Sequence, residues 1–275
     1  MKNSTEAPFE LGCVSYLNSK PLIEPLVDNP RVRVRFAVPA ALLGLIEKRQ
    51  VQAALLPIVD YQKSHDPLLL VPAGAIGSDG PTYTVRIFSP VPPAEIHTLY
   101  ADIESHTSVV LAQVILRERF SVQPRLQPFP AGTAVPVVKP GEAYLYIGDK
   151  VVNAAPPQEQ FPHQLDLGEQ WKNLTGLPFV FAMWMMRADA ASAELANLLA
   201  ATQRAGAGMT DVLVERYAAA TRWPTELARQ YFTHYLKYDV TPAARQGVAR
   251  FFALAAQHDL LPSRRPIQYF GADTA

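Results

Sequence analysis

The segment Val14-Ser15-Tyr16-Leu17-Asn18-Ser19-Lys20-Pro21-Leu22 decides how we interpret the rest of the chain. Its start closes an apolar run, residues 11–16, that predicts a strand, and Pro21 suits the first turn of a helix, where its missing N–H costs nothing. Asn18 is therefore expected in a turn at the carboxyl end of a strand, the edge at which open α/β sheets bind ligands. Asn18 or Ser19 also suits a helix cap, so from these residues alone a ligand site and a cap remain equal alternatives.

Composition and charge predict a globular protein that binds neither nucleic acid nor a membrane. The chain has 275 residues, of which 49% are hydrophobic and 18% charged, and its formal net charge is zero. This length allows one large domain or two modest ones. A nucleic acid or an anionic membrane would favour a basic surface, and no stretch approaches the length of a membrane span. We therefore expect neither a nucleic-acid partner nor membrane association.

A single cysteine, Cys13, restricts the covalent and metal chemistry. One cysteine excludes a disulfide within the chain and a multi-cysteine zinc site, and we interpret Cys13 as a small buried hydrophobe. Residues 1–10 contain no apolar run that would form a signal peptide, so we expect a cytoplasmic protein.

Strands and helices alternate through the first third of the chain. Residues 31–38 alternate in polarity, with arginines that we assign to a solvated strand face rather than to an anion site. A helical pattern at 40–49 and a buried strand at 53–58 complete an order typical of a parallel sheet covered on both faces. Residues 74–81 are rich in turn-forming residues and predict a loop, and 82–89 predict a strand that crosses into a second lobe.

Three hydroxyl side chains, Ser105, Thr107 and Ser108, crowd the start of a helix predicted at 109–120. Free backbone amides and the helix dipole suit an anion such as a carboxylate at this position, although plain N-capping would need only one hydroxyl. His106 lies between them and could contact the same anion. Later in this lobe, a strand at 143–147 leads to Asp149, which either holds a ligand hydroxyl or caps the next turn. Residues 156–174 are polar and predict a loop.

A dense apolar run at 178–186 predicts the strand that returns the chain to the first lobe. We therefore predict an α/β protein in which residues 1–89 and 178–275 form the first lobe, ending in helices, and residues 90–177 form the second. The aromatic residues of the last third recur near helical spacing and are assigned to the core; they are Tyr231, Phe232, Tyr235, Phe251 and Phe252.

The sequence lacks the common nucleotide and catalytic motifs. It contains no glycine-rich dinucleotide or P-loop fingerprint, no His-Glu-x-x-His and no Gly-x-Ser-x-Gly elbow. The remaining candidate site consists of neutral polar groups, which suit an oxygen-rich anion and chemistry without a metal or cofactor; they are Asn18, Thr84, Ser105, Thr107 and Ser108.

Five stretches, in order along most of the chain, resemble the chorismate dehydratase family of the futalosine pathway of menaquinone biosynthesis: residues 15–22 (SYLNSKPL), 78–89 (SDGPTYTVRIFS), 105–109 (SHTSV), 144–149 (YLYIGD) and 166–182 (DLGEQWKNLTGLPFVFA). The resemblance implies a two-lobed fold of the type II periplasmic-binding-protein kind, with a ligand cleft between the lobes. It also implies removal of water from chorismate, a dicarboxylate, to give 3-[(1-carboxyvinyl)oxy]benzoate without a cofactor.

The resemblance also implies roles by position. Asn18 matches the family's cleft asparagine at the reacting centre, and Thr84 stands where the family usually has serine. The hydroxyls at 105, 107 and 108 match a helix start that would bind a substrate carboxylate, although His106 replaces the usual arginine. No strong general base is visible in these motifs, so we hypothesise that a substrate carboxylate takes the proton.

Three alternative functions remain. The sister enzyme that makes 1,4-dihydroxy-6-naphthoate shares the fold, but its family places a histidine after the second-lobe strand, where this chain has Gly148-Asp149. A solute-binding protein of a transporter would need an export signal. A cytoplasmic ligand sensor would bind the same anion without converting it.

Overall fold

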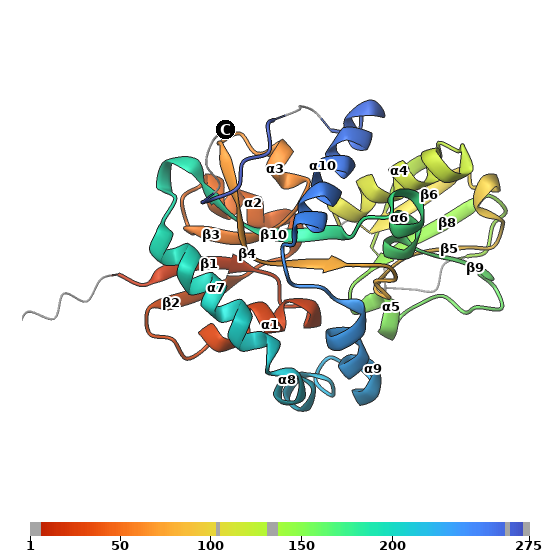
Figure 1. The fold of residues 1–275 in the computed structure, drawn as a ribbon. Helices are drawn as coiled ribbons and strands as arrows, with labels where there is room; N and C mark the ends of the chain where they lie inside the picture. The colour runs from red at the N-terminus through yellow and green to blue at the C-terminus, as the bar shows by residue number, and fades with distance from the viewer. Residues whose placement is uncertain (1–6, 103–104, 131–136, 262–264, 272–275) are drawn as a thin grey trace, which may run out of the picture.

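The structure is a computed structural model that describes residues 7–102, 105–130, 137–261 and 265–271. Two mixed sheets of five strands, each with helices packed on it, lie side by side (Figure 1). Their strand orders are β2-β1-β3-β10-β4 and β7-β6-β8-β5-β9. We call each sheet with its helices the first and the second lobe.

The first sheet confirms the alternation predicted near the N-terminus. Strand β1 (Phe9–Cys13) is parallel to β2 (Val32–Phe36) and β3 (Ala53–Pro57), with helix α2 (Pro39–Glu47) between the last two. The arginines of β2 are exposed, as expected, and Cys13 is fully buried. Strand β10 (Phe179–Arg187) returns from the second lobe, as predicted, and runs antiparallel to β3.

Strand β4 (Leu68–Ser78) corrects the loop predicted at residues 74–81. Its glycines serve the pairing with β10 rather than a turn. A Cβ atom on Gly77 would lie 2.6 Å from the carbonyl oxygen of Phe179, and the register of the two strands shifts between Val180 and Ala182. Glycine therefore permits the close approach of two backbones at a bulge.

The second sheet moves the boundary between the lobes. Strand β5 (Val85–Ser89), which we expected to end the first lobe, pairs with β8 (Glu142–Ile147) and β9 (His163–Asp166) in the second sheet. The chain therefore crosses between Ser78 and Val85. The predicted polar loop at 156–174 is also wrong in its second half, because β9 is followed directly by α6 (Leu167–Thr175). Asp166 caps that helix by accepting hydrogen bonds from the backbone N–H groups of Gly168 and Glu169.

Two further parallel strands complete the second sheet. Strand β6 (Thr98–Asp102) is parallel to β8 and to β7 (Arg125–Phe129). The other helices are η1 (Leu17–Ser19), α1 (Lys20–Ile23), η2 (Glu24–Leu26), α3 (Asp60–Lys63), η3 (Pro93–Glu95), α4 (Thr107–Phe120), α5 (Lys150–Asn153), η4 (Ala188–Ala190), α7 (Ala193–Ala207), α8 (Thr210–Tyr217), α9 (Thr225–Gln230), a π-helix (Tyr231–Tyr235) and α10 (Pro242–Gln257).

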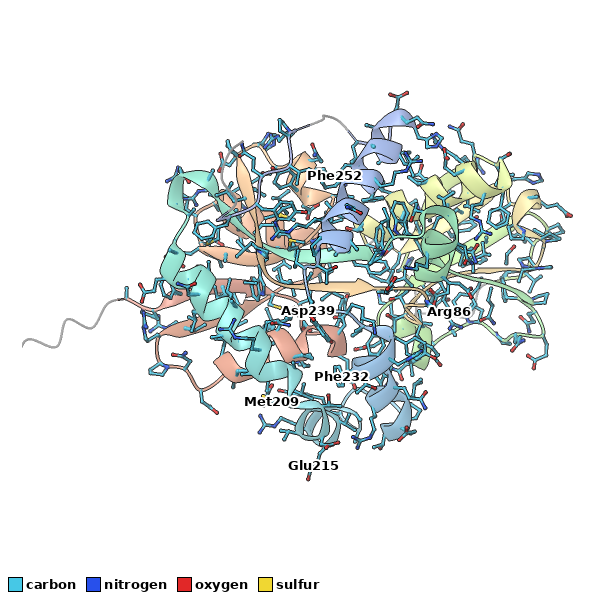
Figure 2. The ribbon with its side chains drawn as sticks, viewed as in Figure 1. Arg86, Met209, Glu215, Phe232, Asp239 and Phe252 are labelled. Carbon is cyan, nitrogen blue, oxygen red and sulfur yellow. The ribbon has the colours of Figure 1, made fainter. Side chains whose placement is uncertain are left out.

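One apolar cluster extends from the first lobe into the second. It includes side chains of β3, β10, α4, β8 and α10, so the two sheets share buried contacts. Phe252, labelled on α10 in Figure 2, belongs to this cluster. Its ring stacks on that of Tyr61 of α3 with centroids 6.1 Å apart. Thr241 caps α10, since its Oγ1 accepts a hydrogen bond of 3.1 Å from the N–H of Ala244. Among the described residues, no helix is long and apolar enough to cross a membrane.

Candidate functional site

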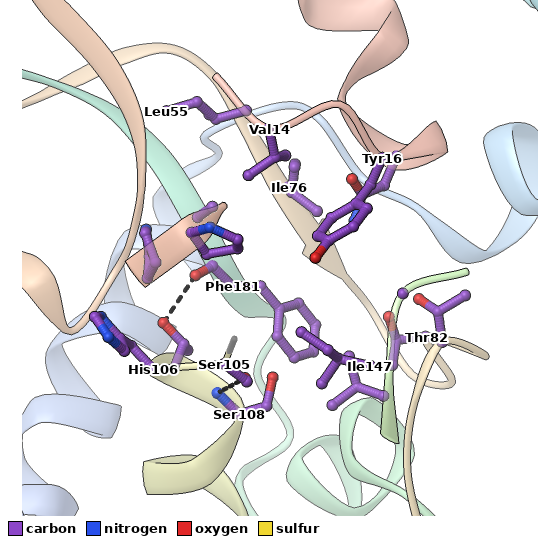
Figure 3. A pocket seen from close by; sticks show the side chains of 18 of the residues that line it. Val14, Tyr16, Leu55, Ile76, Thr82, Ser105, His106, Ser108, Ile147 and Phe181 are labelled. Atoms are coloured by element: carbon purple, nitrogen blue, oxygen red, sulfur yellow. Dashed lines mark hydrogen bonds between the residues drawn. The ribbon is translucent and has the colours of Figure 1, made fainter. Parts of the chain in front are cut away.

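A cavity of about 90 Å³ lies where the first turn after β1, the crossing between the lobes and the start of α4 meet (Figure 3). The structure brings together all five neutral polar residues predicted for the site, because Asn18, Thr84, Ser105, Thr107 and Ser108 line this cavity. Apolar side chains form the rest of its wall, including Val14, Leu55, Ile76, Ile147 and Phe181. A mostly apolar wall with a few convergent polar groups is typical of a small-molecule site.

The first turn is held closed by Ser19 and not by a helix cap. The Ser19 hydroxyl lies 2.8 Å from the carbonyl oxygen of Val14 and 2.9 Å from that of Tyr16. Neither η1 nor α1 has a side-chain cap, which removes the alternative that Asn18 or Ser19 only caps a helix. Tyr238 donates its hydroxyl hydrogen to the backbone oxygen of Asn18 at 3.0 Å and so fixes the position of this residue.

The side chain of Asn18 carries a buried acceptor at the cavity wall. Its Oδ1 atom is buried and has no hydrogen-bond partner in the part of the chain that the structure describes. Its amide N–H group approaches the hydroxyl of Tyr231, which also lines the cavity. A buried acceptor without a partner is costly, so a ligand that donates a hydrogen bond would be stabilised here.

Thr84 is positioned by the crossing segment. Asp166 accepts hydrogen bonds from the backbone N–H groups of Thr82 at 2.9 Å and Tyr83 at 2.7 Å. Tyr83 has a φ of 67°, which a non-glycine residue adopts only when its surroundings enforce it. The next hydroxyl, that of Thr84, consequently faces the cavity and lies 2.7 Å from the Tyr231 hydroxyl.

The three hydroxyls at the start of α4 differ in their contacts. Ser105 Oγ accepts a hydrogen bond of 3.3 Å from the N–H of Ser108, so the N-capping alternative holds for Ser105. Thr107 donates its hydroxyl hydrogen to the carbonyl oxygen of Phe181 at 3.0 Å and ties the helix to β10. Figure 3 shows the hydroxyl of Ser108 turned toward the same space as that of Tyr16. His106 lines the edge of the cavity and contacts the buried Asp60.

Asp149 is not part of the cavity wall, in contrast to the expected contact with a ligand hydroxyl. Its Oδ1 accepts a hydrogen bond of 3.0 Å from Trp223 Nε1, and its carboxylate also accepts one from the N–H of Leu17. Burial raises the pKa of Asp149, while these two hydrogen bonds and the charge of Lys20 oppose the rise. Asp149 therefore ties the second lobe to the first turn, while its neighbour Gly148 lines the cavity.

Two positioning residues were missed in the sequence. Tyr231 was assigned to the core from its helical spacing, and it is 1% exposed, yet its hydroxyl is part of the site. Asp166 was placed in a loop, although its carboxylate organises the crossing beside Thr84. No sequence signal marks the hydroxyl of Tyr231, whereas an aspartate before Leu-Gly-Glu is a recognisable helix N-cap.

The chemistry of the site is that of neutral hydrogen-bonding groups. In the described part of the chain no group of three histidine, cysteine or acidic side chains is arranged to hold a metal ion. Hydroxyl donors and the backbone of a helix start can hold a carboxylate, and one buried amide oxygen can accept from a ligand hydroxyl.

Comparison with known sequences finds a family model that matches most of the chain and a chorismate dehydratase among the similar proteins. A family model described as menaquinone biosynthesis matches residues 9–257. A chorismate dehydratase from Thermus thermophilus is 28% identical over 259 residues, which cover 89% of this chain and 94% of that protein.

Comparison with solved structures gives the fold. A protein from Archaeoglobus fulgidus superposes with a TM-score of 0.70 at 13% identity, covering 92% of this chain and 98% of that one. A Candida albicans protein described as having the generic periplasmic-binding-protein fold gives 0.68 at 12% identity, covering 94% and 92%. The aliphatic sulphonate binding protein SsuA from Escherichia coli gives 0.63 at 14% identity, covering 98% and 96%. These likenesses confirm the predicted periplasmic-binding-protein-like fold.

Proposed function

Since this chain belongs to the menaquinone biosynthesis family, we propose that it is a chorismate dehydratase, a hydro-lyase that converts chorismate to 3-[(1-carboxyvinyl)oxy]benzoate and water. The observation that carries the proposal is the cavity between the lobes, in which the predicted polar residues meet and Asn18 Oδ1 is a buried acceptor without a partner among the described residues. The name of the Thermus thermophilus relative supports the same activity.

The proposed reaction needs orientation more than strong acids or bases. Loss of the ring hydroxyl together with the proton on the adjacent ring carbon makes the ring aromatic, so the product is favoured before the protein contributes. The protein has to hold two carboxylates, align the two breaking bonds and exclude water. The start of α4 with Ser108 would hold one carboxylate, and the apolar wall around Phe181 would enclose the ring.

None of the five neutral polar residues predicted for the site is a strong acceptor for the ring proton. The polar residues predicted for this site are an asparagine, serines and threonines, which are weak bases. We therefore propose that a carboxylate of chorismate removes the ring proton. That proton ends on the departing hydroxyl oxygen, so that water is released and neither an oxidant nor a reductant is needed.

Incubation of the purified protein with chorismate alone tests the proposal. We expect one molecule of the aromatic product to form for each molecule of chorismate consumed. Ultraviolet absorbance measures both amounts, and mass spectrometry confirms the product. Turnover should persist after treatment with a chelator. Binding of chorismate without conversion would instead identify a ligand sensor, and no binding would return the sister naphthoate enzyme to consideration. Cell fractionation tests the cytoplasmic location that we propose for the enzyme.

A further inference from the structure

The ring of Tyr231 is buried in the core, but its hydroxyl contacts a residue of the site. A buried phenol hydroxyl is costly without partners, so a purely structural position would suit phenylalanine better. The Tyr231 hydroxyl instead lies 2.7 Å from Thr84 Oγ1, and the amide N–H of Asn18 approaches it from the first turn. All three residues line the cavity. The tyrosine thus links two predicted site residues that come from different segments of the chain.

The ring of Tyr231 is held firmly in place. It stacks on the indole of Trp223 with centroids 4.7 Å apart and an interplanar angle of 27°. The indole is itself fixed by Asp149, which accepts its N–H hydrogen at 3.0 Å. Tyr231 also begins a π-helix of five residues, a departure from α-helical geometry that is frequent at functional sites.

A count of donors and acceptors shows what these three residues offer a ligand. Asn18 Oδ1 is a buried acceptor without a partner in the described chain, and a hydrogen bond from the Asn18 side chain opposes the rise that burial causes in the pKa of Tyr231. Thr84 and Tyr231 carry one hydroxyl hydrogen each, and their mutual contact uses only one of them. Whichever hydroxyl donates, the other keeps a hydrogen for the ligand. The three residues therefore hold one buried acceptor and one spare hydroxyl hydrogen at the cavity wall.

We propose that Tyr231 is a positioning residue that sets Asn18 and Thr84 to recognise the departing ring hydroxyl of the substrate. This inference rests on the proposed function. An alcohol both donates and accepts a hydrogen bond, so it matches the pair of groups described above. The hydroxyl of the substrate donates to Asn18 Oδ1, while its oxygen accepts from the Thr84 and Tyr231 pair. The second hydrogen bond strengthens as the C–O bond breaks and charge develops on that oxygen.

Substitution Tyr231→Phe removes the phenol oxygen and keeps the ring that stacks on Trp223. We expect kcat for chorismate to fall about 10- to 100-fold, since misplacement of the two groups acts mainly on the transition state. KM should change less than about threefold. The affinity for the reaction product, which lacks the ring hydroxyl, should not change. A merely structural role would weaken substrate and product binding together.

Two further variants keep the test decisive. Thr84→Val should lower kcat similarly, and the double variant should be no worse than the poorer single one, because the two hydroxyls act as a unit. Tyr61→Phe is the matched control, since its hydroxyl lies 2.7 Å from the Pro266 carbonyl oxygen outside the cavity. Thermal melting checks that each variant folds. If the wild-type protein turns over chorismate and Tyr231→Phe has the same kcat, the inference about Tyr231 is wrong and the proposed function stands. If the wild-type protein does not turn over chorismate, the proposed function is wrong.

Discussion

Asp60 of α3 and His106 at the start of α4 join the two lobes at the edge of the cavity, with Oδ1 of the aspartate 2.8 Å from Nδ1 of the histidine. Asp60 is fully buried, and its second oxygen, Oδ2, has no partner among the described residues. His106 therefore supplies the hydrogen bond on which this carboxylate depends. The position that the family usually fills with arginine thus has a structural role in this chain.

The first prediction follows from that dependence. His106→Ala deprives the buried Asp60 carboxylate of this hydrogen bond and should lower the free energy of unfolding by roughly 1–3 kcal/mol. Asp60→Asn in the same background removes the charge and should restore part of the loss. Urea denaturation of both single variants and the double variant measures the coupling. Additive effects would show that the pair contributes nothing beyond its separate residues.

The second prediction concerns Asn18. Asn18→Ala removes the buried amide acceptor and should reduce turnover of chorismate by about 100-fold or more. The dissociation constant should rise less than about tenfold, because one neutral hydrogen bond contributes roughly 0.5–1.5 kcal/mol. Steady-state kinetics and calorimetry measure the two quantities separately. Asn29→Ala, in an exposed turn, is the matched control, and full activity of Asn18→Ala would remove this residue from the mechanism.

The third prediction is a pH dependence of stability at Asp149. Burial raises the pKa of Asp149 in the folded state, so folding favours its protonated form. Its contribution to stability is complete below the unfolded pKa, which is about 3.9, and is lost as the pH rises through the higher folded pKa. The amide that replaces this carboxyl group in Asp149→Asn does not titrate, so the variant lacks this pH dependence.

We therefore expect the stability of Asp149→Asn, relative to wild type, to increase from about pH 4 to about pH 7. Thermal melts of both proteins across this range measure the difference in stability at each pH. Altered hydrogen bonds shift that difference by the same amount at every pH and so do not change its trend. A difference that stays level, or decreases with pH, would contradict the assignment of a raised pKa. The Trp223 fluorescence of each protein checks that the indole contact survives.

The fourth prediction compares two glycines in helices. A Cβ atom on Gly206 of α7 would lie 1.8 Å from the carbonyl oxygen of Pro21, in the helix that follows Asn18, whereas one on Gly44 of α2 would meet nothing within 4 Å. Gly206→Ala should destabilise the protein by about 1–3 kcal/mol and move the first turn. Gly44→Ala should stabilise it by about 0.5–1 kcal/mol. Chemical denaturation compares them, and a neutral Gly206→Ala would show that α7 can shift without cost.

The sequence predicted those elements whose patterns depend on local physics. Thr241-Pro242 marks a helix start because the capping hydroxyl and the fixed φ of proline act within the first helical turn. The alternation in β2 places Arg33 and Arg35 on the solvated face and buries Val32 on the other. Strand β4 was missed because Gly77 is needed by a distant partner, Phe179, and only the folded pair reveals that need.

The candidate site was likewise predictable only for residues that local patterns mark. Asn18 and Ser108 follow from their places after a strand and before a helix, which local patterns reveal. The Tyr231 hydroxyl meets Thr84 across a separation of 147 residues, and neither helical spacing nor burial distinguishes it from a core aromatic. Asp149 was misplaced because its partner, Trp223, comes from the remote connection between α8 and α9.

The apolar cluster that passes from one sheet to the other also constrains how the molecule melts. Its members in β3, α4, β8 and α10 exclude water only while both halves are present. Unfolding of either half would expose apolar side chains of the other half to water, so the chain should unfold in a single cooperative transition. Neither half, expressed separately, would keep this shared cluster dry.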